Sequence, residues 1–441
     1  MAELTLMKNA AEQQLAAEWQ KAKAALPGPA SLRAAAFERF AATGLPTRRV
    51  EEWKYTDLRT LMRDAKPLSV RPDAATFARL KDAGTSLGDL DARRIVLADG
   101  YLDPAWTDQS GHDPGVTITE LFTWLGQDLS FRARQISENV PDDVAVSLNT
   151  AFMTGGVVIH VRKEAAIERP LHLAHVFSGT APAATYPRSV VIVEPGARVM
   201  LIESFEGPEL DYQVNTALQL IVGDGAHVDH IKVTREGAKA LHLSSLMANV
   251  GAQARFNTFA FTTGGAVVRN QLFVRFAGEG TLANIRGATL LKARQHVDTT
   301  MVVDHAALGC QSREVFKTVL DDESRGVFQG KIIVRPGAQK TDAKMASHAL
   351  MLSEDAEADN KPELEIYADD VQCGHGATAG DLDEDLLFYL KARGIPHAEA
   401  EALLIQAFVG DAIEGIEDAG LREALIEAVG TWVKTRGETR G

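Results

Sequence analysis

Residues 190–197 read VVIVEPGA, a short run of β-branched residues followed by a glycine turn. Comparable glycine turns follow at a regular pitch: for Gly196, Gly225, Gly251, Gly280, Gly309 and Gly337 the intervals are 29, 26, 29, 29 and 28 residues. Such a period, with short strands between the turns, is typical of a solenoid whose coils stack to bury their apolar faces. An antiparallel β-sandwich would space its turns less evenly. The sequence therefore predicts a mainly β protein with a right-handed parallel β-helix core.

Helical patterns flank this core. Residues 8–25, 31–43 and 397–415 are predicted helices, while Arg94 to Ala98 read as a strand. We assign 1–150 to an N-terminal helical and mixed domain, 151–380 to the β-helix and 381–441 to a C-terminal helical domain. Helices at both ends are expected to cap the stack of strands. In the last domain one helical face is predicted to form a small core or a partner groove: Ala400, Leu403, Leu404, Ala407 and Phe408.

Composition limits the function. The 441 residues carry a net charge of −14, which argues against a nucleic-acid surface, and no apolar run of about 18 residues predicts a membrane span. The two cysteines, Cys310 and Cys373, exclude a disulfide scaffold and suit a reducing cytoplasm. They are also too few to hold an iron–sulfur cluster alone, since a cluster takes four protein ligands.

The segment 368–380 reads ADDVQCGHGATAG and places Cys373 near His375 in a glycine-rich run. A thiolate and an imidazole are candidate iron ligands. Taken alone, the histidine is more simply a turn residue bonded to a carbonyl, and the cysteine a small buried hydrophobe. Cys310 is interpreted as structural, because only His305 nearby suggests an activated thiolate.

Two other groups of polar residues are weaker candidates for a metal site. In HVDH, His227 and Asp229 should face one side of a strand and His230 the other, so we expect solvated residues rather than a metal site. Asp304 and His305 are predicted to face opposite sides for the same reason. In EEWKY, residues 51–55, Trp53 and Tyr55 are predicted to anchor the N-terminal helices on the core.

Several phrases, in this order, resemble the SufB/SufD family of the SUF iron–sulfur cluster assembly system. They are GLPTRRVEEWKYTDL (44–58), LNTAF (148–152), RGVFQGKIIV (325–334), AQKTDA (338–343), the Cys-His segment and LFYLKARG (387–394). Within the family the chain is more similar to SufD than to SufB, because Gly376 rather than an acidic residue follows His375.

The resemblance implies a non-catalytic, cytoplasmic scaffold subunit of a SufBCD complex. It implies pairing with SufB through the β-helix and docking of the SufC ATPase on the C-terminal helices; the sequence itself has no G-x-x-x-x-G-K-[ST] phosphate loop. Cys373 and His375 would lie at the partner interface, with His375 the stronger iron ligand. The cluster would be transient and shared with SufB, with none bound permanently.

Alternatives remain open at this point. A β-helical polysaccharide lyase would share the fold, although the chain has only 6% aromatic residues for stacking on sugars. A purely structural subunit, with every cluster ligand on its partner, differs only at Cys373 and His375. An exposed β-helix edge would also allow the isolated chain to form a homodimer.

Overall fold

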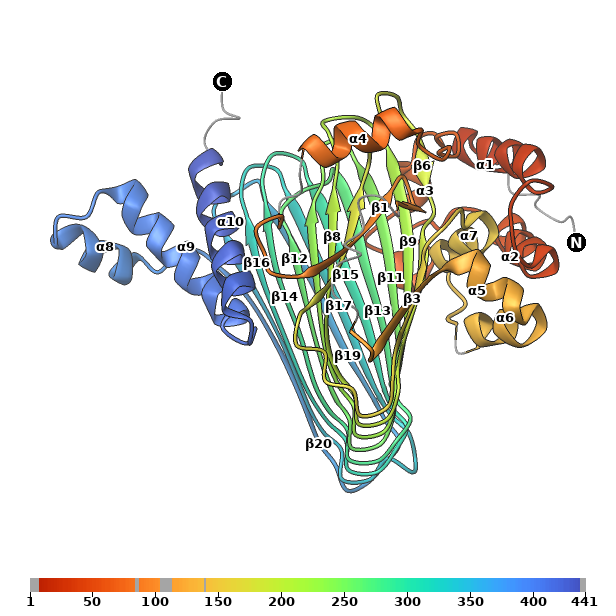
Figure 1. Ribbon diagram of the computed structural model, residues 1–441. Helices are drawn as coiled ribbons and strands as arrows, with labels where there is room; N and C mark the ends of the chain where they lie inside the picture. Colours follow the sequence, from red (N-terminus) through yellow and green to blue (C-terminus); the bar gives the residue numbers. More distant parts are fainter. Residues whose placement is uncertain (1–7, 84–86, 104–112, 139, 437–441) are drawn as a thin grey trace, which may run out of the picture.

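The computed structural model describes residues 8–83, 87–103, 113–138 and 140–436. Its core is a stack of coils in which successive strands alternate between two parallel sheets (Figure 1). Within the described residues each sheet path runs from the first coils to β20 or β19, and almost every neighbouring pair is parallel. The predicted parallel solenoid is confirmed.

The first sheet contains, in spatial order, β2 (Tyr101–Leu102), β1 (Arg93–Ala98), β5 (Leu171–Val176), β8 (Arg198–Glu206), β10 (His227–Arg235), β12 (Arg255–Thr262), β14 (Leu282–Leu291), β16 (Gln311–Leu320), β18 (Asp342–Met351) and β20 (Gln372–Gly380). The second contains β19 (Glu357–Ile366), β17 (Arg325–Val334), β15 (His296–His305), β13 (Val267–Phe276), β11 (Leu241–Val250), β9 (Gln213–Val222), β7 (Arg188–Val193), β4 (Val157–Val161) and β3 (Val116–Glu120), with β6 (Ala184–Thr185) beside β9. Strands β1 to β3 thus bring part of the segment 1–150 into the sheets.

One column of turns carries the repeat. Its residues have positive φ angles of 72° at Gly196, 66° at Gly225, 52° at Gln253, 66° at Gly280 and 69° at Gly309. Each donates its backbone N–H to a carbonyl of the next coil, as from Gly225 to Ala252 at 2.7 Å. Gly251 was therefore the wrong marker for its coil, because the left-handed residue there is Gln253. Lys340, with φ of 61°, likewise replaces Gly337.

We expect Gly225→Ala to lower the free energy of unfolding by about 1 kcal/mol, because an L side chain is disfavoured in the left-handed region. A Cβ at Gly225 meets no atom within 4 Å, so the effect is conformational rather than steric. Gln253→Ala is the matched control and should change stability by less than about 0.5 kcal/mol. Urea unfolding of the three proteins measures both, and equal midpoints for Gly225→Ala and wild type would contradict the assignment.

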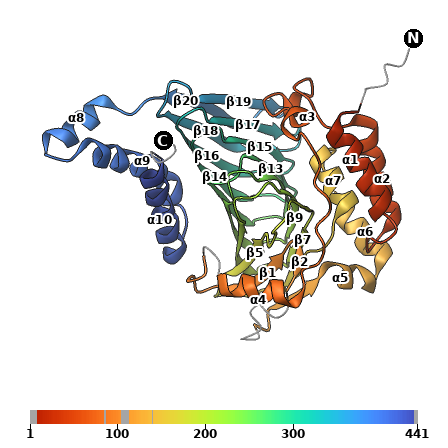
Figure 2. The same cartoon turned by 90° about the horizontal axis from the view of Figure 1, so that it is seen from above.

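The N-terminal helices pack on the outer face of the second sheet (Figures 1 and 2). They are α1 (Ala10–Ala22), α2 (Ala30–Thr43), α3 (Leu58–Leu61), α5 (Leu121–Gln127), α6 (Leu129–Ser137) and α7 (Val144–Phe152), while α4 (Ala74–Ala83) lies against β1 and β5. Trp19, Phe37 and Phe152 are buried between α1, α2 and α7; Trp19 stacks on Phe37, and Phe152 meets both rings edge-on. Leu241 and Leu243 of β11 extend this apolar cluster onto the sheet.

The C-terminal helices are α8 (Glu384–Ala392), α9 (His397–Ile413) and α10 (Ala419–Thr435). Helices α9 and α10 pack on the outer face of the first sheet, with α9 over β14 and β16, whereas α8 contacts α9 and has no buried residue. The buried face of α9 is formed by Ala400, Ile405, Val409, Ala412 and Ile413. The predicted face was right at Ala400, which is buried, and at Phe408, which packs against the same cluster, but wrong at Leu403 and Ala407, which are exposed. No helix among the described residues is long and apolar enough to cross a bilayer.

Candidate functional site

The last coil forms an open end of the solenoid. In the described chain β20 pairs only with β18 along its sheet, and β19 only with β17 (Figure 2). Most of β20 is exposed. The expectation that helices cap both ends is wrong here, because the C-terminal helices cover the side of the stack instead. Two strand edges are therefore accessible to another protein.

Strand β20 brings the two predicted site residues together. Cys373 is in register with Ala343, and His375 with Met345. Since Ala343 and Met345 both belong to the interior core, Cys373 and His375 share the inward-facing side at the open end. Cys373 is half-buried against that core, whereas His375 is exposed. The thiol and the imidazole thus point the same way at the mouth of the solenoid.

A buried carboxyl group lies two strands behind them. Glu314 of β16 is in register with Met345, so it occupies the same inward-facing row as His375. Its side chain is fully buried, and neither carboxylate oxygen has a hydrogen-bond partner among the described residues. Burial raises the pKa of Glu314 to about 7 despite the opposing effects of Ser312 and Arg313. Nothing local in the sequence pointed to this residue.

The thiol of Cys373 is held in its protonated form. Burial raises its pKa, and the charges of Asp342 and Glu314 add to the effect. Among the described residues no group of three or more His, Cys, Asp or Glu side chains is arranged to hold a metal ion. Cys373 and His375 are two ligands where a cluster takes four, so any cluster bound here needs ligands from a second protein.

Cys310 lies two coils away and is inaccessible. Its thiol is buried and donates to the carbonyl of Gly278 at 3.3 Å, and burial raises its pKa. Burial also lowers the pKa of His305 to about 4, so this imidazole is neutral and bonds Ser312 at 3.0 Å. These contacts favour the structural interpretation of Cys310. As predicted, Asp304 and His305 face opposite sides of the strand; His305 is the one that faces inward, against Phe276.

The HVDH segment gives a mixed result. His227 and Asp229 share the outer face and lie 3.4 Å apart, and His230 faces inward, as predicted. The expectation that they are solvated was wrong for Asp229 and His230, which are buried. The imidazole of His230 bonds Glu203 at 3.0 Å and Thr258 at 2.9 Å inside the solenoid. The alternation of the strand predicted which side each residue faces but not whether it is buried. Asp229 is buried because the C-terminal helices cover the outer face, and His230 because it lies inside the solenoid.

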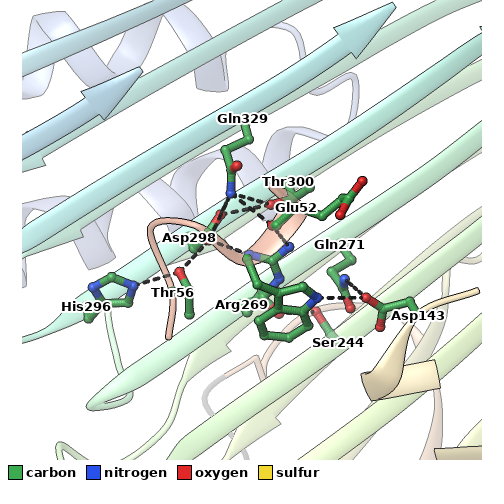
Figure 3. A network of polar contacts seen from close by, with 11 residues as sticks. Glu52, Thr56, Asp143, Ser244, Arg269, Gln271, His296, Asp298, Thr300 and Gln329 are labelled. Carbon is green, nitrogen blue, oxygen red and sulfur yellow. Dashed lines mark hydrogen bonds and ion pairs between the residues drawn. The ribbon is translucent and has the colours of Figure 1, made fainter. Parts of the chain in front are cut away.

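Trp53 anchors the N-terminal segment, as predicted. Its ring is buried, and the guanidinium carbon of Arg269 lies 3.9 Å from the ring centre. The indole N–H donates to Asp143 at 3.1 Å. Arg269 is in turn ion-paired with Asp298, and both side chains are fully buried (Figure 3). Arg269 and Asp298 were missed from the sequence, because one residue of the pair lies on β13 and the other on β15.

The C-terminal helices present apolar side chains to solvent. On α8 the exposed fractions are 50% for Leu386, 73% for Phe388 and 52% for Tyr389. Helix α8 has no buried residue within its own bounds, and Leu403 of α9 is also exposed. Exposed large apolar side chains of this kind are typical of a protein-binding site.

The chain matches the family model "SUF system FeS cluster assembly, SufBD core domain" over residues 175–408 and "SufBD protein N-terminal region" over residues 15–173. It is 31% identical to the iron–sulfur cluster assembly protein SufD of Escherichia coli, over 88% of this chain and 89% of that protein. It is 29% identical to an iron–sulfur cluster assembly SufBD family protein of Synechocystis, covering 87% of each, and 25% identical to SufD of Bacillus subtilis, covering 88% and 89%.

Both matching family models describe SUF proteins and neither describes a polysaccharide lyase. Together they cover the N-terminal helices, the solenoid and much of the C-terminal helical region. The chain therefore belongs to the SufBD family of the SUF iron–sulfur cluster assembly system, as a SufD-type member.

Proposed function

We propose that this chain is a non-catalytic scaffold subunit of a complex of SufB, SufC and SufD type, which assembles iron–sulfur clusters. The observation that carries the proposal is the pair formed by Cys373 and His375, which face the same way at the open end of the solenoid. The cluster is the cargo of the complex and is held only in transit.

Pairing with SufB through the solenoid is supported by the exposed edges of β19 and β20. Each is the last strand of its sheet in the described chain, so its outer edge offers unpaired backbone N–H and C=O groups. A partner solenoid that adds strands to these edges would extend both sheets across the interface. Cys373 and His375 would then be enclosed between the two proteins. In isolation, the same edges would allow a homodimer.

Docking of the SufC ATPase on the C-terminal helices is supported by the exposed apolar surface of α8. Phe388 is 73% exposed, and aromatic side chains of this kind are frequent anchors of protein interfaces. The sequence has no phosphate-binding loop of its own, so nucleotide hydrolysis is assigned to the partner.

The roles of the two candidate ligands follow from their surroundings. His375 is exposed and needs no rearrangement to bind iron through its imidazole. Cys373 must first lose a proton from a thiol whose pKa is raised by burial, so it serves as a ligand only once a metal or a change at the interface favours the thiolate. We therefore assign His375 as the first iron ligand and Cys373 as the second.

The test is co-expression of the tagged chain with SufB and SufC under anaerobic conditions, followed by assay of iron and sulfide on the purified complex. We expect His375→Ala to recover both partners but to lose most of the iron and sulfide, and Cys373→Ala to lose part of them. His160→Ala, on β4 at the other end of the solenoid, is the matched control. Full iron and sulfide in a Cys373→Ala/His375→Ala double variant would select the purely structural subunit instead.

A further inference from the structure

A cavity of about 220 Å³ lies between the solenoid and its C-terminal helices, away from the open end. Its floor is the outer face of β10, β12 and β14, and its wall is the C-terminal end of α9 and the turn that follows it. Its polar lining includes His227, Asp229, Asn257, Asn284, Arg255, Arg286 and Glu417. A liquid water molecule occupies about 30 Å³, so the cavity has room for a small solute.

The acidic groups of this cavity are already engaged. Asn284 donates to the side-chain oxygen of Asn257 at 2.9 Å, and Asn257 donates to Asp229 at 2.7 Å. The other carboxylate oxygen of Asp229 lies 3.4 Å from His227. Glu417 is ion-paired with Arg198 at 3.0 Å. Both carboxylates thus already have partners: an amide and an imidazole for Asp229, and a guanidinium for Glu417.

The two arginines that line the cavity have no such partner. Among the described residues, neither Arg255 nor Arg286 has a carboxylate within ion-pair distance or a side-chain hydrogen bond. This is unexpected in a chain with 60 acidic and 46 basic residues. The guanidinium of Arg286 packs against Gly415, where an added Cβ would lie only 2.6 Å from Nη1. Arg286 therefore points into the cavity beside the end of α9.

We infer that this cavity is a binding site for a small oxyanion, a phosphate or a carboxylate group carried by a small molecule. Two unpaired guanidinium groups supply planar pairs of N–H donors that match the oxygens of such a group. The free donors of the asparagine ladder and His227 lie on the same floor. Because one wall is α9, a bound anion also ties the C-terminal helices to the solenoid.

Isothermal titration calorimetry of the full chain with inorganic phosphate, and separately with malonate, tests the site at constant ionic strength. We expect saturable binding of at least one of the two, and which one binds identifies the group. Arg286→Gln and Arg255→Gln should each weaken binding at least about tenfold, since each loses charged hydrogen bonds. Arg286→Lys should restore part of the affinity. Arg294→Gln, a surface arginine at another turn, is the control and should bind like wild type.

A second readout separates specific binding from the general stabilisation of proteins by phosphate. Hydrogen exchange of residues 412–417 should slow on addition of the anion that binds in wild type and not in Arg286→Gln. Thermal melts of each variant show whether it is folded, and the exposed Arg255 provides a second variant if Arg286→Gln unfolds. Absence of saturable binding for both anions, or equal binding by wild type and a folded Arg255→Gln, overturns the inference.

Discussion

Asp298→Ala is expected to lower the free energy of unfolding by about 3–5 kcal/mol, because it leaves the buried Arg269 without its counter-ion. Both side chains are fully buried, so water cannot solvate the remaining guanidinium. Asp298 also accepts a hydrogen bond from Thr56 and lies 3.2 Å from the amide nitrogen of Gln329 (Figure 3). Its loss therefore removes a shared acceptor for groups on the N-terminal segment and on two strands.

Unfolding in guanidinium chloride measures this loss in the free energy of unfolding. The matched control is Arg269→Met/Asp298→Leu, which removes both charges and should cost less than Asp298→Ala alone. Arg269 also lies over the Trp53 ring, so Asp298→Ala should shift the tryptophan emission of the folded protein by loosening this contact. A loss below about 1 kcal/mol for the single variant would show that the pair does not hold the N-terminal segment on the sheet.

The solenoid could be predicted because glycines recur at its turns with the period of one coil. Gly196, Gly225, Gly280 and Gly309 occupy the left-handed position that disfavours other residues. The spacing went wrong at Gln253 and Lys340, where an ordinary residue takes that conformation and a nearby glycine lies two or three positions earlier. The hydrogen bonds to the next coil hold these residues there, and the sequence alone does not show them.

The site was predictable only in part, for a related reason. Cys373 and His375 are two residues apart on one strand, so the alternation of a strand places them together. Glu314 reaches the same row only through the register of three strands, and Arg286 meets its cavity only because α9 ends above it. The buried face of α9 was predicted only in part for the same reason, because the position of the sheet beneath the helix determines which of its apolar residues are buried.

Glu314 is the residue whose behaviour depends most on pH. Its pKa in the folded protein is about 7, against 4.5 for an ordinary glutamate, because burial disfavours the carboxylate. The folded state therefore favours the protonated form. The associated stability is fully present below about pH 4.5 and is lost as the pH rises through about 7. By linkage, the cost at pH 8 and above is about 3 kcal/mol.

Glu314→Gln is accordingly expected to make the protein more stable by up to about 3 kcal/mol at pH 8, and by less than about 1 kcal/mol at pH 5. The amide has the size of the protonated acid but cannot ionise, so the variant should lose this part of the pH dependence. Urea unfolding at pH 5, 6, 7 and 8 measures the difference, with the exposed Glu354→Gln as control. If the variant is no more stable at pH 8 than at pH 5 relative to wild type, Glu314 is solvated or paired in solution. If the prediction holds, the solenoid keeps, two strands behind Cys373 and His375, a buried acid that lowers its stability at alkaline pH.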